Sequence, residues 1–132
     1  MMYVPVVKNK TPHTATGKVR YKNDWVVIDC PFDIVYYYNR VCNWMLHKQN
    51  KITWPLHGAH ITVVAGKYTK VKKNWGYRAD ETVKFNYGTL TNNDNYFWLV
   101  VDCPEASEIR EKLGLSPEPK WPYHLTVGYL NE

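Results

Sequence analysis

The chain has 132 residues, 45% of them hydrophobic, and a formal net charge of +5. This length favours one domain, and this hydrophobic share is typical of a folded globular protein rather than a disordered one. No apolar run is long enough to cross a membrane, and three cysteines, an odd number, argue against a secreted disulfide framework. The first residues, "MMYVPVVKNKT", lack the basic-then-apolar order of a signal peptide, so we expect a cytoplasmic protein without a membrane partner.

The first half of the chain predicts strands at 17–22 and 25–31, a helix at 32–49 and a strand that begins at His60. The helical spacing predicts one buried face, made of Ile34, Tyr37, Tyr38, Val41, Met45 and Leu46.

The second half predicts the same order of elements. A strand at 82–90 precedes a strand at 98–104, and a helix at 105–114 precedes a strand that begins at His124. "WVVIDCP" in the first half returns as "WLVVDCP" in the second, and a Trp-Pro pair precedes both histidine strands. An internal duplication accounts for two matched phrases in the same order.

The duplication predicts a single α+β domain over residues 1–132, with one lobe at about 17–66 and another at about 82–130. Each lobe would be a strand-helix-strand unit, with a small sheet and a helix packed outside it. We expect the two lobes to be related by a pseudo-twofold axis and to enclose a central cleft.

The repeated phrases "HITV" and "HLTV" place a polar pair in an otherwise apolar strand. Because side chains alternate faces along a strand, His60 and Thr62 share one face, as do His124 and Thr126. Buried polar groups without partners cost free energy, so equivalent pairs in both repeats call for a functional reason. Convergence of the four side chains on the cleft would supply that reason.

Two histidines and two threonines suit phosphate chemistry. One histidine can act as general base and the other as general acid, since the unperturbed pKa of histidine lies near neutrality. Threonine hydroxyls can donate hydrogen bonds to phosphate oxygens, and such donors need no metal beside them. We therefore predict His60 and His124 as catalytic residues and Thr62 and Thr126 as substrate-binding residues, with no cofactor and no metal.

Two H-x-T motifs in a small duplicated α+β protein resemble the two-histidine (2H) phosphoesterase superfamily, which includes the LigT-like RNA phosphoesterases. The resemblance covers about residues 17–130. It implies a bilobal fold with a central cleft and metal-independent handling of phosphodiesters that carry a neighbouring ribose hydroxyl. The short chain is most similar to compact viral members, some of which degrade cyclic oligonucleotide messengers of bacterial immunity. The resemblance therefore suggests a phage anti-defence role in the host cytoplasm.

Other residues lie near the motifs and add candidate substrate contacts. The segment 66–78 is basic and interleaved with aromatics, a pattern that suits nucleotides, and we assign Lys67 and Trp75 from it. Tyr123 directly precedes the second motif and is assigned the same role. A solvated hairpin is the alternative for the segment, and packing is the alternative for the aromatic residues.

Three readings of the function remain open. The first is a metal-independent phosphodiesterase, a hydrolase or nuclease acting on an oligonucleotide or cyclic nucleotide, with no obligatory protein partner. The second is a non-catalytic module that binds a nucleotide or RNA end in the same cleft. The third is a metallohydrolase that uses His57, His60 and His124. The cysteines are expected to be buried apolar residues rather than ligands.

Overall fold

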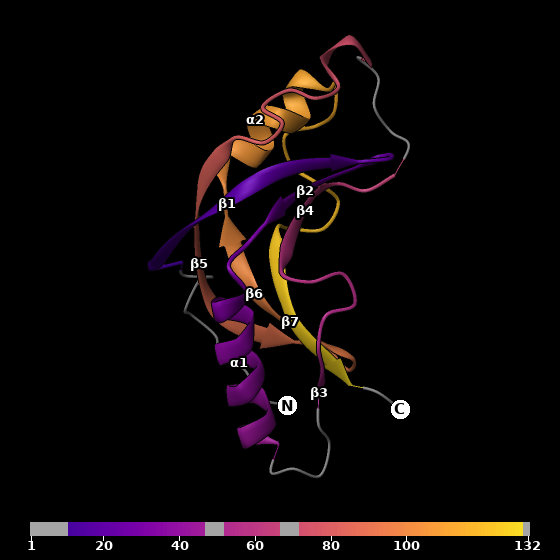
Figure 1. The fold of residues 1–132 in the computed structure, drawn as a ribbon. Coiled ribbons are helices and arrows are strands. Elements are labelled where there is room, and N and C mark those ends of the chain that lie inside the picture. Colours follow the sequence, from indigo (N-terminus) through magenta and orange to yellow (C-terminus); the bar gives the residue numbers. More distant parts are fainter. Residues whose placement is uncertain (1–10, 47–51, 67–71, 131–132) are drawn as a thin grey trace.

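The computed structural model describes residues 11–46, 52–66 and 72–130 (Figure 1). The elements in chain order are β1 (His13–Lys22), β2 (Trp25–Asp29), α1 (Phe32–Met45), β3 (Ile52–Thr53), β4 (His60–Val64), the short 3-10 helix η1 (Lys72–Asn74), β5 (Thr82–Asn92), β6 (Tyr96–Asp102), α2 (Pro104–Lys112) and β7 (His124–Leu130).

The seven strands of the described residues form one sheet in the order β3-β7-β4-β2-β1-β5-β6, and all pairings are antiparallel. β6 also pairs with β7, so six of the strands close into a barrel. The predicted α+β class is confirmed, but the two small sheets are replaced by one. The reason is the long pairing of β1 with β5, which runs from His13–Tyr87 to Lys18–Thr82 and joins the two halves. The pseudo-twofold duplication of two lobes stays a prediction.

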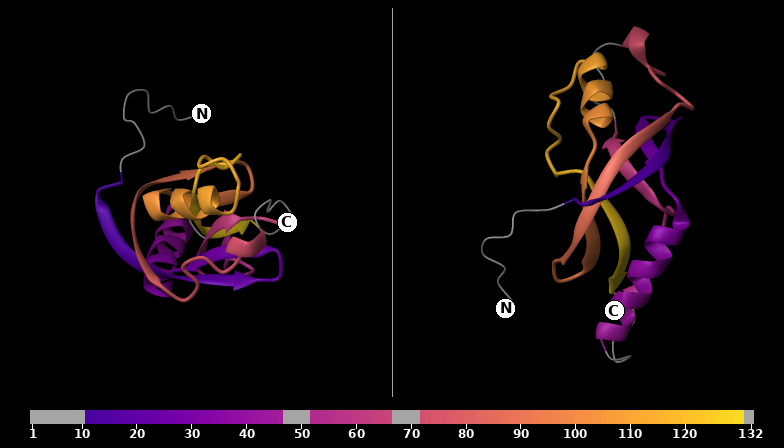
Figure 2. Two further views of the ribbon diagram at one scale, coloured as in Figure 1. Left: turned by 90° about the horizontal axis from the view of Figure 1, so that it is seen from above. Right: turned by 90° about the vertical axis from the view of Figure 1, so that its left-hand side faces the viewer.

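The two helices lie toward opposite ends of the molecule (Figures 1 and 2). α1 packs mainly on β7 and β3, and α2 packs mainly on β4 and β5. Each helix therefore covers the histidine strand of the other half of the sequence, which interlocks the two halves. No helix among the described residues combines the length and the apolar character needed to cross a membrane.

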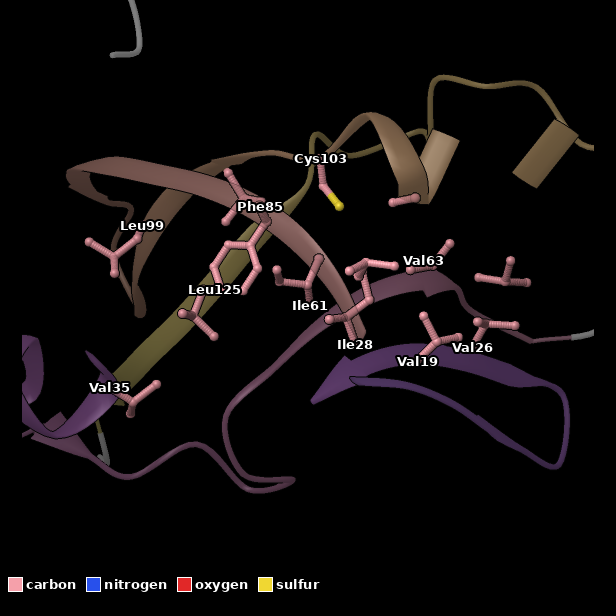
Figure 3. Packing of buried hydrophobic residues seen from close by; sticks show 14 of the residues in the cluster. Val19, Val26, Ile28, Val35, Ile61, Val63, Phe85, Leu99, Cys103 and Leu125 are labelled. Atoms are coloured by element: carbon pink, nitrogen blue, oxygen red, sulfur yellow. The ribbon is translucent and has the colours of Figure 1, made fainter. Parts of the chain in front are cut away.

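The core lies on the apolar face of the histidine strands (Figure 3). Ile61, Val63, Leu125 and Val127 are at most 1% exposed, so the predicted apolar face of both strands is confirmed. Burial of each such aliphatic side chain stabilises the fold by about 1.5–3 kcal/mol. Through the alternation of a strand, this burial directs the histidines and threonines to the opposite face, which we call the outer face.

The buried face of α1 differs from the predicted one. Val35, Asn39 and Cys42 are buried, whereas Tyr37 and Met45 are 61% and 50% exposed, so their predicted burial was wrong. The cause is Asn39, a polar residue at the centre of the buried face, whose amide has hydrogen-bond partners in the fold.

Candidate active site

The outer face of β4 and β7 carries the four predicted residues. The two strands pair antiparallel at Ile61 and Leu125. This register sets His60 level with Thr126 on the neighbouring strand, and Thr62 level with His124. The two histidines are then diagonal neighbours, a relation in which Cα atoms lie about 7–8 Å apart. The fold thus brings the two motifs side by side from positions 64 residues apart in the chain.

Both histidine rings are held in the same way. His60 Nδ1 lies 3.1 Å from the carbonyl oxygen of Gly58, and His124 Nδ1 lies 2.9 Å from that of Pro122. A carbonyl can only accept, so Nδ1 carries the hydrogen and donates it. In the neutral ring Nε2 then holds the lone pair, and neither Nε2 has a hydrogen-bond partner among the described residues. Each ring is thereby prepared to accept or deliver a proton at Nε2.

A β-bulge follows the threonine in each motif. The register between β4 and β2 shifts at Val63, and the register between β7 and β6 shifts at Val127. The carbonyl of Val63 accepts a hydrogen bond from Arg110 Nη1 at 2.8 Å, and that of Val127 accepts one from Asn39 Nδ2 at 2.9 Å. A bulge bends its strand and re-aims neighbouring side chains, so these donors from the two helices hold the motifs in their orientation.

A pocket of about 390 Å³ lies on the outer face beside His60. β1 and β2 supply Arg20, Lys22 and Trp25 to its lining, and His57 lies in the loop before β4. Arg20 donates from Nε and Nη2 to the carboxylate of Asp29 at 2.7 and 3.0 Å. Its remaining nitrogen, Nη1, has no hydrogen-bond partner among the described residues. The pocket therefore has a cationic wall.

A second pocket, of about 670 Å³, is lined by His124 and Thr126. Its other walls are mainly aromatic and uncharged, with Tyr96, Trp98, Trp121, Tyr123, Thr91 and Asn93. Trp98 and His124 meet edge-to-face, with their ring centroids 6.3 Å apart. The sequence predicts one central cleft, whereas the described side chains form a pocket on each side of the seam between β4 and β7.

The other predicted contacts fall in different places. Tyr123 lines the second pocket, and its hydroxyl lies 3.2 Å from Ser107 Oγ. Trp75 packs edge-to-face on Tyr21 at 4.9 Å between ring centroids and lines neither pocket. Lys67 lies outside the described residues.

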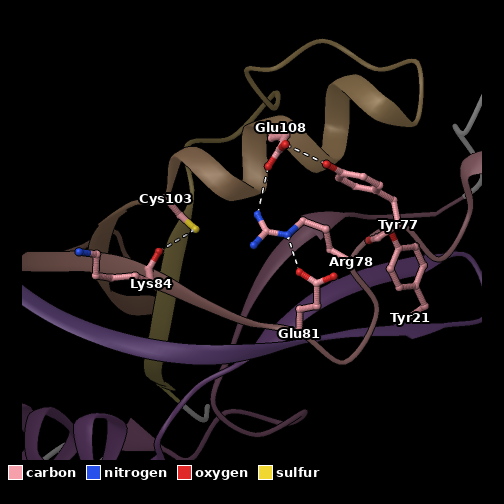
Figure 4. A network of polar contacts seen from close by, with 7 residues as sticks. All are labelled: Tyr21, Tyr77, Arg78, Glu81, Lys84, Cys103 and Glu108. Atoms are coloured by element: carbon pink, nitrogen blue, oxygen red, sulfur yellow. Dashed lines mark hydrogen bonds and ion pairs between the residues drawn. The ribbon is translucent and has the colours of Figure 1, made fainter.

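The basic segment is also tied into the fold by acidic residues from outside it (Figure 4). Arg78 donates to Glu81 and to Glu108, both at 3.0 Å. The Tyr77 hydroxyl donates to Glu108 at 2.8 Å. Arg78 is therefore engaged in structural ion pairs with the protein's own carboxylates rather than available to a substrate phosphate.

The cysteines offer no nucleophile. Cys42 and Cys103 are buried, and burial raises the pKa of each thiol to about 11. Burial also raises the pKa of the half-buried Cys30. All three residues are free thiols, and their protonated form is a weak nucleophile.

The metal alternative has no ligand set within the described residues. His57 and His60 are neighbours, with ring centroids 6.4 Å apart. Nevertheless, no group of three or more His, Cys, Asp or Glu side chains in residues 11–46, 52–66 and 72–130 is placed to hold a metal ion.

Sequence reasoning named Tyr123, which lines the second pocket, but missed most of the other walls of both pockets. Strand alternation could have shown that four of these residues point away from the core, because they alternate with the buried Val19, Val26 and Leu99 in their strands. The four residues are Arg20, Lys22, Trp25 and Trp98. The sequence holds no local signal for their position beside the histidines, which depends on long-range pairing.

Two histidines held alike on neighbouring strands can act as a general acid and a general base. The comparison with protein-family models agrees, because the model described as "Swiss Army Knife, 2H phosphoesterase domain" matches residues 38–132. The chain belongs to this 2H phosphoesterase family, whose members are generally hydrolases of phosphodiester bonds. Comparison with curated proteins and with solved structures gave no match.

Proposed function

We propose that the protein is a metal-independent phosphodiesterase that cleaves RNA-type linkages by general acid-base catalysis with His60 and His124. The matched hydrogen bonds of the two imidazoles carry the proposal, because they leave both Nε2 atoms available on one face of neighbouring strands. A pure binding module has no need of a matched acid and base. The family match supports a phosphodiester as the substrate.

The chemistry needs one neutral and one protonated imidazole. The neutral ring accepts the proton of the ribose 2′-hydroxyl at Nε2, and the 2′-oxygen forms a bond to phosphorus. The bond from phosphorus to the 5′-oxygen breaks, and the protonated ring gives its proton to that oxygen. The products are a 2′,3′-cyclic phosphate and a 5′-hydroxyl, and proton exchange with water restores both rings. Proximity of the 2′-hydroxyl to phosphorus replaces part of the entropic barrier that a free water molecule must overcome.

The threonines stabilise the charge that builds up on the phosphate. The register sets one hydroxyl level with each histidine, with Thr126 beside His60 and Thr62 beside His124. Each hydroxyl can donate to a non-bridging oxygen. Together with the protonated imidazole they supply stabilisation without a metal.

Cyclic oligonucleotide messengers of bacterial immunity are one candidate substrate, in a phage anti-defence role within the host cytoplasm. Linear RNA or RNA ends, 2′,3′-cyclic phosphates and 2′,5′-linked oligonucleotides are the other candidates, and in a 2′,5′ linkage the hydroxyl beside the phosphate is the 3′-hydroxyl.

The test is product analysis by mass spectrometry with a panel of linear and cyclic oligonucleotides. His60→Ala and His124→Ala should each reduce the rate by about 10²–10⁴-fold, the usual contribution of a general acid or base. Thr62→Val and Thr126→Val should reduce it less. His13→Ala is the matched control, because His13 is exposed on β1 and lines neither pocket.

A second pair of substrates tests the nucleophile. A substrate with 2′-deoxyribose at the scissile position should not be cleaved, and equal turnover of the ribo and deoxy forms would rule out internal attack. Full activity after chelation is expected. Tight binding of the panel without any turnover would favour the alternative, a non-catalytic nucleotide- or RNA-binding module.

A further inference from the structure

The two pockets share lining residues at equivalent positions of the repeats but differ in the residues that neighbouring strands contribute. Trp25, Val27 and His60 line the first, and Trp98, Val100 and His124 line the second. These are equivalent positions of the two repeats. The neighbouring strand makes the difference, since β1 adds two cations to the first pocket and β5 adds an uncharged threonine to the second.

From this asymmetry we infer that the substrate carries a nucleobase in the pocket beside His124 and a second, non-scissile phosphate in the pocket beside His60. The inference rests on the proposed function, because it takes the scissile phosphate to lie between the two histidines. It goes beyond the family match, because β1, which supplies the two cations, lies before residue 38.

The second pocket suits a base. Its volume of about 670 Å³ lies within the range of small-molecule sites, about 300–1,000 Å³. Four aromatic side chains, Tyr96, Trp98, Trp121 and Tyr123, offer ring faces or edges, and Asn93 offers an amide donor and acceptor. Base stacking on such rings contributes about 1–3 kcal/mol per base, and it does not depend on a charge.

The first pocket suits a phosphate. Lys22 is exposed at its rim, and Arg20 presents Nη1 while its other two nitrogens hold Asp29. The ion pair fixes the guanidinium in place and neutralises it in part, so Lys22 is the main positive charge for a ligand. The substrate class is therefore an oligonucleotide, linear or cyclic, with at least two phosphates, rather than a nucleotide with one.

The test is calorimetric titration with ligands that cannot be cleaved. The probes are a deoxyadenosine dinucleotide with one phosphate, the same dinucleotide with a terminal phosphate at the 5′ or the 3′ end, and a phosphorylated abasic counterpart. Calorimetry is preferred because the tryptophan variants would alter a fluorescence signal. Trp121 is 70% exposed and Lys22 is also exposed, so Trp121→Ala and Lys22→Ala should both fold.

We expect the two substitutions to weaken the binding of different probes. Trp121→Ala should weaken binding of the base-bearing probes about tenfold and leave the abasic probe unchanged. Lys22→Ala should weaken only a probe with a terminal phosphate, by about fivefold at low salt, and Lys22→Glu should weaken it further. The matched controls are Trp44→Ala, an exposed tryptophan on α1, and Lys84→Ala, an exposed lysine on β5, because neither lines a pocket.

Three outcomes would overturn the inference. The first is that Trp121→Ala lowers the affinity for all probes, including the abasic one, to the same extent. The second is that a terminal phosphate at neither end raises the affinity of the wild-type protein, and the third is that Lys22→Glu keeps the rise in affinity that the terminal phosphate gives. The outcome is separable from that of the proposed function. The binding pattern without any cleavage of ribo substrates would refute catalysis and leave the assignment of the pockets standing. Cleavage without the pattern would refute the assignment alone.

Discussion

The hydrogen bonds of Asn39 make a sharp prediction about what holds the second motif in place. Asn39 is 2% exposed and donates from Nδ2 to the carbonyl of Val127, the extra residue of the β7 bulge. Its Oδ1 accepts from Asn43 Nδ2 at 3.0 Å, and Asn43 Oδ1 accepts from the amide of Ile52 at 2.8 Å. This chain of amides joins α1 to β7 and β3.

Asn39→Ala removes the centre of this chain. A buried carbonyl that loses its donor costs about 1–3 kcal/mol, and the Asn43 amide loses its acceptor as well. The expected loss in the free energy of unfolding is therefore about 2–4 kcal/mol. For a chain of this size that corresponds to a decrease in Tm of about 6–15 °C.

Urea denaturation followed by circular dichroism measures the loss. Asn92→Ala is the matched control, since the Asn92 side chain is exposed and donates to the neighbouring carbonyl of Asn93, and it should stay within about 0.5 kcal/mol of wild type. A double-mutant cycle with Asn43→Ala should show coupling, because the two amides share a bond. An Asn39→Ala protein as stable as wild type would refute the claim that this bond braces the bulge.

The remaining predictions concern thiols, a close backbone approach and acid stability. Cys42 and Cys103, with pKa values near 11, should react slowly with iodoacetamide at pH 8.5 and rapidly in denaturant, as mass spectrometry would reveal. Gly17→Ala should destabilise the fold by about 1–3 kcal/mol in urea, since its Cβ would lie 2.6 Å from a carbonyl oxygen of β2. The hydrogen bond from Tyr77 lowers the pKa of Glu108, so its stabilisation is present above the unfolded pKa and disappears as pH decreases. The Tm of Glu108→Gln should then be lower than that of wild type near pH 7, and the two values should converge as the pH decreases through the lowered pKa of Glu108.

Local patterns predicted the elements and their apolar faces. The alternation in "HITV" and "HLTV" correctly separated Ile61 and Leu125 from the polar pair, because burial on one face of a strand is a period-two signal. The same argument failed for α1, where Tyr37 was counted as buried and Asn39 was not. A buried amide depends on a partner carbonyl 88 residues away, and no helical periodicity reports it.

Long-range pairing accounts for the other differences. The pairing of β1 with β5 unites the sheet, and the packing of each helix on the histidine strand of the other half interlocks the two units. Neither follows from the order of elements in the chain. The bulges at Val63 and Val127 also depend on a mismatch between partner strands, although both lie directly after the motif threonine.

A shift of two residues in strand register explains how a repeated sequence makes an unequal pair of pockets. In the first half, Asp29 pairs with His60. Its repeat equivalent, Asp102, would pair with His124 if the registers matched, but His124 pairs with Val100 and Trp98 pairs with Thr126.

Directly paired residues share a face, so this shift removes a carboxylate from the side of His124 and sets an apolar and aromatic surface in its place. On the other side, the carboxylate of Asp29 stays beside His60 and holds Arg20 at the edge of the pocket. The two motifs can therefore be alike in their histidines and threonines while their surroundings favour different parts of one ligand. A register that restored the pairing of Asp102 with His124 would withdraw Trp98 from Thr126, and with it the aromatic wall on which base recognition depends.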